Sequence, residues 1–240
     1  GVNTQQLFVD NEAVGTAEVL TRILISVEGV EDGDDDGDDE TIGVLRGEYQ
    51  VSEESTTTER PFALDRTYTV ELRQDARGRQ EVPEASFVPQ VRNVPVFPQE
   101  AIAPGDTWSA PAYEVYDFRE GLAIADPVIV PVDAQYEYLG PREFEGRTYD
   151  ALRIRYNLFY RPPPARPEAE TIRLMTARFS QELLWDHIAG RAHYYEETYN
   201  LFVQLADGTR SEYRGTADGR IVAAPPLDRD ALRREIAAAI

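Results

Sequence analysis

The sequence predicts an all-β protein: a large antiparallel meander sheet that forms a sandwich or an incomplete barrel, with one short C-terminal helix. Three observations support this fold class. Apolar and polar residues alternate along several segments, turn residues separate those segments, and prolines gather where neither a helix nor a central strand can run. Because strands joined by short turns pair antiparallel, the pattern favours a meander over parallel crossovers.

The expected strands are rich in β-branched and aromatic residues. Residues 148–160 show the alternation clearly, with Leu152, Ile154, Tyr156 and Leu158 on one face. The same kind of pattern predicts strands at residues 17–30, 41–51, 66–73, 107–118, 128–139, 148–160, 171–186, 191–203 and 209–216.

Turn signals between these segments combine polar residues with glycine. The Asp207-Gly208 pair is the strongest, because this dipeptide suits a two-residue hairpin turn. Turns are predicted at residues 75–78, 187–190, 207–208 and 218–219. Prolines at positions 83, 89, 95, 98 and 104 predict instead that residues 83–105 form an extended connection across the domain.

The end of the sequence has a different pattern. Asp228 is a plausible helix N-cap, and Leu232, Ile236 and Ile240 repeat at a spacing of four. We therefore expect residues 1–224 to form a single antiparallel β domain. Residues 225–240 would be a linker and a helix that lead to a further C-terminal domain. The chain begins with Gly rather than Met, from which we expect a processed start.

Composition excludes several classes of function. The chain has 44 acidic and 24 basic residues, so its formal net charge is −20, and all the basic residues are Arg. Such a charge repels nucleic acid and anionic membrane surfaces, so neither is expected as a partner. There is no Cys, which excludes disulfides and thiolate chemistry. No apolar run approaches the ~20 residues of a spanning helix, so no transmembrane segment is predicted.

One acidic run has the spacing of a metal site. Asp32, Asp34, Asp36 and Asp39 could supply several of the oxygen ligands that Ca²⁺ requires. The run departs from the EF-hand pattern, because the position of the bidentate Glu is held by Gly43. Two interpretations therefore remain open, a weak calcium site and a solvated hairpin tip between two strands.

No catalytic residue is predicted, and we expect the chain not to be an enzyme; a hydrolase is the least favoured alternative. His187 and His193 lack a second His at metal-ligand spacing and are expected either at the surface or packed in a hairpin. The sequence has no nucleophile elbow, no phosphate-binding loop and no dinucleotide motif. The 13 Tyr and 9 Phe are expected mainly in the core, with a ligand groove or a partner surface as the alternative.

The central part of the sequence resembles a known family through a group of short segments. These are residues 93–98 (NVPVFP), residues 104–108 (PGDTW), residues 136–140 (YEYLG), Gly146 and the strand ending at Tyr156. Over residues 60–220 the chain resembles the β-rich N-terminal region of spirochaetal outer-membrane-associated proteins that carry a C-terminal OmpA-like domain. The P-G-D-x-W segment is also similar to periplasmic open-barrel domains of the lipoprotein-carrier kind.

The resemblance implies a setting in the cell envelope, periplasmic or outer-membrane-associated. It implies a non-enzymatic role in envelope architecture or protein–protein contact, with an envelope protein or cell-wall partner bound through the missing C-terminal domain. It carries over no site residues and no cofactor. The carrier likeness implies the alternative, an open barrel that binds a lipid or another apolar ligand.

Overall fold

The computed structural model describes residues 1–32, 41–55 and 64–222. This part of the chain forms one antiparallel sheet with two short helical segments, α1 (Arg119–Leu122) and a 3₁₀ turn (Pro167–Glu170). The strands are β1 (Val2–Val9), β2 (Glu12–Asp32), β3 (Thr41–Ser55), β4 (Leu64–Asp75), β5 (Gln80–Glu81), β6 (Val91–Arg92), β7 (Thr107–Tyr116), β8 (Val128–Phe144), β9 (Arg147–Tyr160), β10 (Ile172–Asp186), β11 (Arg191–Leu205) and β12 (Arg210–Arg220).

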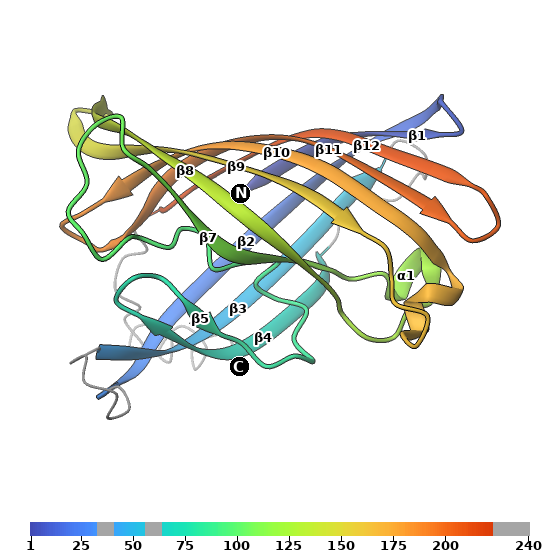
Figure 1. Cartoon of the computed structure of the whole chain (residues 1–240), viewed down its shortest axis with the longest axis horizontal. Coiled ribbons are helices and arrows are strands. Elements are labelled where there is room, and N and C mark those ends of the chain that lie inside the picture. The colour runs from blue at the N-terminus through green and yellow to red at the C-terminus, as the bar shows by residue number, and fades with distance from the viewer. Residues whose placement is uncertain (33–40, 56–63, 223–240) are drawn as a thin grey trace, which may run out of the picture.

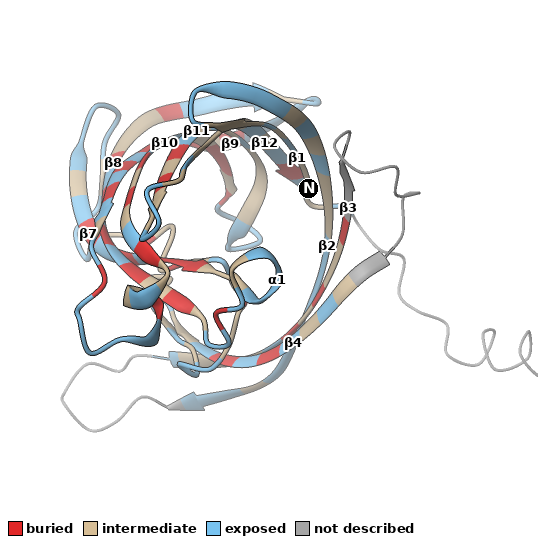
Figure 2. Cartoon of the chain, turned by 90° about the vertical axis from the view of Figure 1, so that its right-hand side faces the viewer, coloured by how far each residue is buried: buried red, intermediate tan, exposed pale blue. Residues whose placement is uncertain are grey.

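The sheet order is β5-β4-β3-β2-β1-β12-β11-β10-β9-β8-β7-β6. The meander is therefore continuous in space, and β1 and β12 lie side by side within it. The sheet curls into a nearly closed barrel, as Figures 1 and 2 show. The predicted all-β fold and incomplete barrel are thus confirmed. The predicted C-terminal helix lies outside the described residues.

Most of the predicted hairpin turns are present, but one is wrong. Residues 218–219 do not turn: β12 runs straight through them, with Asp218 opposite Val2 and Gly219 opposite Tyr195. A Cβ on Gly219 would lie 2.4 Å from a ring carbon of Tyr195. This glycine therefore makes room for an aromatic ring that lies across the strand, a use of glycine that a turn-based interpretation misses.

The inner face of the barrel carries the main hydrophobic core. In β9, Leu152, Ile154, Tyr156 and Leu158 are all buried, as their alternation predicts. The core cluster extends across β7 to β11, and Figure 2 shows buried residues concentrated on that side of the ring. The barrel thus encloses its apolar residues, and many outward-facing residues on these strands are polar or charged.

A seam remains where the ends of the sheet meet, because no ladder joins β4 and β5 to β6 and β7 in the described structure. Residues 83–105 cross this seam, as predicted. The hydrogen bonds that hold them in place include Gln80 N–H to Asn93 Oδ1 at 2.7 Å, Phe97 N–H to Arg77 O at 2.9 Å, and Trp108 Nε1–H to Val96 O at 2.7 Å. In the described residues no helix is long and apolar enough to cross a membrane.

Candidate functional site

The predicted calcium residues cannot be placed together. Asp32 is the last residue of β2, and Asp34, Asp36 and Asp39 lie outside the described residues. Within the described ranges, no group of three or more His, Asp or Glu side chains could hold a metal ion. Calcium binding by the acidic run therefore stays a prediction.

The two histidines lie near the β10–β11 hairpin. The His193 ring stacks on Tyr149, with centroids 4.4 Å apart, and packs edge-on against Phe144. His187 Nδ1 lies 3.0 Å from a carboxylate oxygen of Asp150. The stacking of His193 confirms the expected packing role for that residue.

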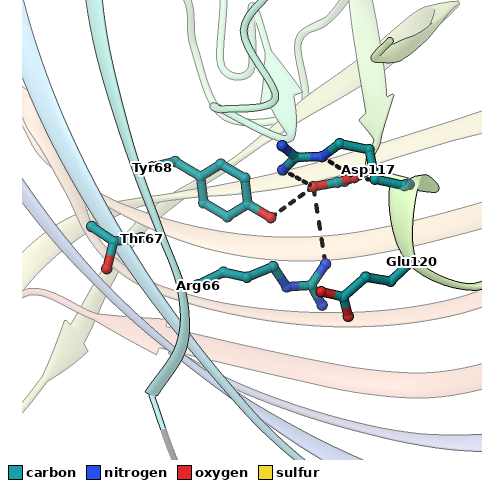
Figure 3. Close-up of a pocket in the computed structure, with 6 residues that line it drawn as sticks. Arg66, Thr67, Tyr68, Asp117 and Glu120 are labelled. Carbon is teal, nitrogen blue, oxygen red and sulfur yellow. Dashed lines mark hydrogen bonds and ion pairs between the residues drawn. The ribbon is translucent and has the colours of Figure 1, made fainter. Parts of the chain in front are cut away.

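A polar hollow of about 400 Å³ lies at one end of the seam, between β4 and the segment that follows β7. Figure 3 shows Asp117 at its centre, facing Tyr68 and Arg66 of β4. The Tyr68 hydroxyl donates to Asp117 Oδ2 at 2.8 Å, and Arg119 forms two hydrogen bonds to the same carboxylate at 3.0 and 2.6 Å. The Arg66 guanidinium lies 3.9 Å away.

This arrangement joins the two sides of the seam. Burial opposes ionisation of Asp117, but the hydrogen bonds from Arg119 and Tyr68 outweigh it and lower its pKa to about 2. Asp117 is therefore a charged anchor at neutral pH. Its oxygens are already engaged by groups of the chain itself, so the hollow is best explained as a polar latch that closes the barrel.

Two carboxyl groups face the barrel interior: Glu114, which is buried, and Glu197, which is partly exposed. Glu114 of β7 is 5% exposed and accepts a 2.5 Å hydrogen bond from the Tyr156 hydroxyl. Burial raises the pKa of Glu114 to about 8; the hydrogen bond lowers it, and the nearby Glu197 carboxylate raises it. Burial likewise raises the pKa of Glu197, on β11, to about 7.

Tyrosines surround these two groups. The Tyr116 hydroxyl is enclosed and has no hydrogen-bond partner among the described residues. The Tyr199 hydroxyl lies 2.8 Å from Asn3 Oδ1 and 3.0 Å from Gln5 Oε1, and its ring continues a stack that includes Phe179. Raised carboxyl pKa values can mark a catalytic site, but Glu114 is buried and its carboxylate is already bonded to Tyr156.

The most unusual surface of the molecule is on β2. Strand β1 pairs with β2 only as far as Leu20, and Gly1 and Thr21 form the last pair, with hydrogen bonds of 2.7 and 2.9 Å. Beyond this point β2 continues to Asp32 with β3 on one side, and no other strand of the described structure faces it on the other side. Figure 1 shows β2 running on past β1 toward the end of the molecule where β5 lies.

The side chains along this open edge are apolar and exposed. Ile25 pairs with Gly47, which pairs in turn with Val70, a buried inner-face residue, so Ile25 faces inward. Its exposed fraction is nevertheless 56%, and its neighbours on the strand are similarly open. The exposed apolar residues of this stretch are Ile23, Leu24, Ile25, Val27 and Val30.

The backbone of the same stretch is also accessible. Thr21 directs its N–H and C=O toward β1, so by alternation Ile23, Ile25 and Val27 direct theirs toward the same open side. We name residues 22–28 the open edge. The sequence predicts a strand here but does not reveal this site, because an apolar run reads alike whether or not another strand covers it.

Comparisons of the chain with protein-family models, with curated proteins and with solved structures find no match. The resemblance to spirochaetal proteins with an OmpA-like domain therefore stays a prediction.

Proposed function

We propose that the chain is a non-enzymatic protein-contact module that binds an extended segment of a partner by adding it as a strand to the open edge. The observation that carries this proposal is the coincidence of unpaired backbone groups and exposed apolar side chains along residues 22–28. Main-chain hydrogen bonds give such docking its affinity, and the alternate side chains give it specificity.

The open edge defines the chemistry of the segment. An antiparallel partner needs apolar residues opposite Ile23, Ile25 and Val27, which lie on the inward face. On the outward face, an acidic residue would complement Arg22 and a basic residue would complement Glu28. The Glu28 carboxylate lies on that face, because it accepts a 2.6 Å hydrogen bond from Ser26 Oγ.

The alternative of an apolar-ligand carrier has less support. The hollow at the end of the seam is lined by charged and polar residues; another hollow of about 330 Å³, on the β1–β2 hairpin, has a more apolar lining but is open to solvent and encloses no ligand-sized space. Carrier sites are lined mainly by apolar side chains. A hydrolase also has less support, since Glu114 is enclosed and bonded to Tyr156. The cell-envelope setting is part of the proposal, and the resemblance of residues 60–220 supports it.

A labelled heptapeptide of sequence KVTVTVE tests the docking. Antiparallel pairing about Ile25 places the Lys of this peptide opposite Glu28 and its Glu opposite Arg22. The three Val residues of the peptide then lie on the inward face, opposite Val27, Ile25 and Ile23. We expect saturable binding by fluorescence anisotropy.

Two matched variants of the protein locate the site. Ile25→Lys places a charge on the inward face and should weaken binding at least about tenfold, while Leu24→Lys adds the same charge outward and should change it by less than about threefold. A peptide N-methylated at its central Val loses a donor to β2 and should not bind. Equal binding to both variants would contradict the proposal.

A further inference from the structure

We propose that the strand bound at the open edge is supplied by a second copy of this chain, so that two molecules pair through residues 22–28 about a two-fold axis at Ile25. This inference rests on the proposed function and names the partner. The chain carries a segment of the required chemistry, because residues 22–28 read basic, apolar, apolar, apolar, polar, apolar, acidic (RILISVE).

The side chains of this segment are self-complementary. In antiparallel pairing centred on Ile25, Ile23 of one copy lies opposite Val27 of the other, and Ile25 lies opposite itself. These residues share the inward face, where they are 53–67% exposed in the single chain. On the outward face Arg22 lies opposite Glu28, twice in the dimer, and both side chains are exposed.

The backbone hydrogen-bonding groups of the segment also suit this pairing. The residues that direct N–H and C=O to the open side are Ile23, Ile25 and Val27, and pairing about Ile25 brings residues of this same set opposite one another. A centre between two residues would instead place residues of this set opposite residues that bond to β3. Hydrogen bonding therefore allows pairing centred on any residue of the segment, and Ile25 is the centre that brings Arg22 opposite Glu28.

The ends of the segment also fit this register. On one side the pairing stops at Arg22, because Thr21 is already paired with Gly1. On the other side the register of β2 shifts between Val27 and Gly29, where a β-bulge bends the strand. Since Glu28 lies opposite Arg22, the bulge of each copy falls next to the residue at which the other copy's pairing stops.

The overall charge opposes this association. Each chain has a formal net charge of −20, so two copies repel one another at long range. At an ionic strength of about 0.15 M the Debye length is about 8 Å, which screens the long-range repulsion more than a contact ion pair. The association is therefore to be measured at that ionic strength.

Sedimentation velocity of the full chain between about 1 and about 100 μM tests the inference by a charge swap. Wild type should show a concentration-dependent dimer. Arg22→Glu and Glu28→Arg each create two like-charge contacts and should weaken the dimer about tenfold, and the double variant should restore it to within about threefold of wild type. A wild type that stays monomeric, or a double variant no better than the single ones, overturns the inference.

The peptide KVTVTVE separates this inference from the proposed function. If the peptide binds wild type while the chain stays monomeric, docking stands and the second copy is excluded. If the peptide does not bind and the chain also stays monomeric, both proposals fail. Thermal melts of each variant confirm folding; the substituted side chains are exposed, so we expect changes within about 0.5 kcal/mol.

Discussion

The β7–β10 side of the barrel and the β2 side both carry apolar residues on the inward face, but only the first side buries them. On the β7–β10 side, inward residues such as Val130 and Ile154 are 0% exposed, while on β2 the inward Ile25 is 56% exposed. Both sides have apolar inward faces, and on both the outward residues include apolar ones, such as Leu24 of β2 and Ile129 of β8. What differs is coverage: the first side packs against its neighbours and the chain that crosses the seam, whereas β2 extends past β1 without a second neighbour in the described structure. Apolar alternation therefore specifies a face and not its burial.

The sharpest test of this comparison replaces one residue on each side. Ile154→Ala leaves a cavity in a packed core and should lower the free energy of unfolding by about 3 kcal/mol. At a protein concentration too low for pairing of two copies, Ile25→Ala removes a side chain that is 56% exposed and should cost less than about 1 kcal/mol. Urea denaturation of both variants measures the difference. Equal losses would mean that β2 is covered in solution.

The packed side should also respond to pH. The pKa of Glu114 is about 8 in the folded chain and about 4.5 when unfolded, so between these values the folded state binds more protons. Stability contributed by the protonated group is therefore present in full below pH 4.5 and is lost as pH rises toward 8, with a slope on the order of 1 kcal/mol per pH unit.

Glu197, with a pKa of about 7, should act in the same direction up to about pH 7. Glu114→Gln keeps the shape of the side chain and removes its titration, so its unfolding free energy should fall less steeply between pH 5 and about 8. Denaturation at a series of pH values measures both slopes. Parallel curves for wild type and variant would contradict the assignment and leave the general acidity of the chain as the cause.

The smallest expected effect separates two glycines. Gly219→Ala brings a methyl group to 2.4 Å from a Tyr195 ring carbon, so the ring must shift, and we expect a loss of about 2 kcal/mol. Gly29→Ala meets nothing within 4 Å on the open side and should change stability by less than about 0.5 kcal/mol. Thermal melts provide the comparison. A Gly219→Ala variant as stable as wild type would contradict the close approach of the Tyr195 ring to Gly219.

The strands could be predicted from the sequence because their alternation involves only residues close together in the chain. The inward faces of β4, β8, β9 and β11 follow from alternation, and the Asp207-Gly208 turn follows from backbone preference. The open edge, residues 22–28, could not be predicted in this way. In the described structure β1 pairs with β2 up to Leu20, Gly1 pairs with Thr21, and β2 continues to Asp32; which strands lie beside one another, and over what length, cannot be inferred from either strand alone.

The antiparallel β meander, and the residues that share a face of it, could be predicted from the sequence because both depend on neighbours a few positions apart. Three other features became visible only in the folded chain: β1 and β12 lie side by side, Gly219 makes room for a tyrosine ring, and one apolar face stays uncovered. These features depend on contacts between residues up to nearly the full length of the chain apart. Such contacts form through the closure of the whole sheet and leave no local signal.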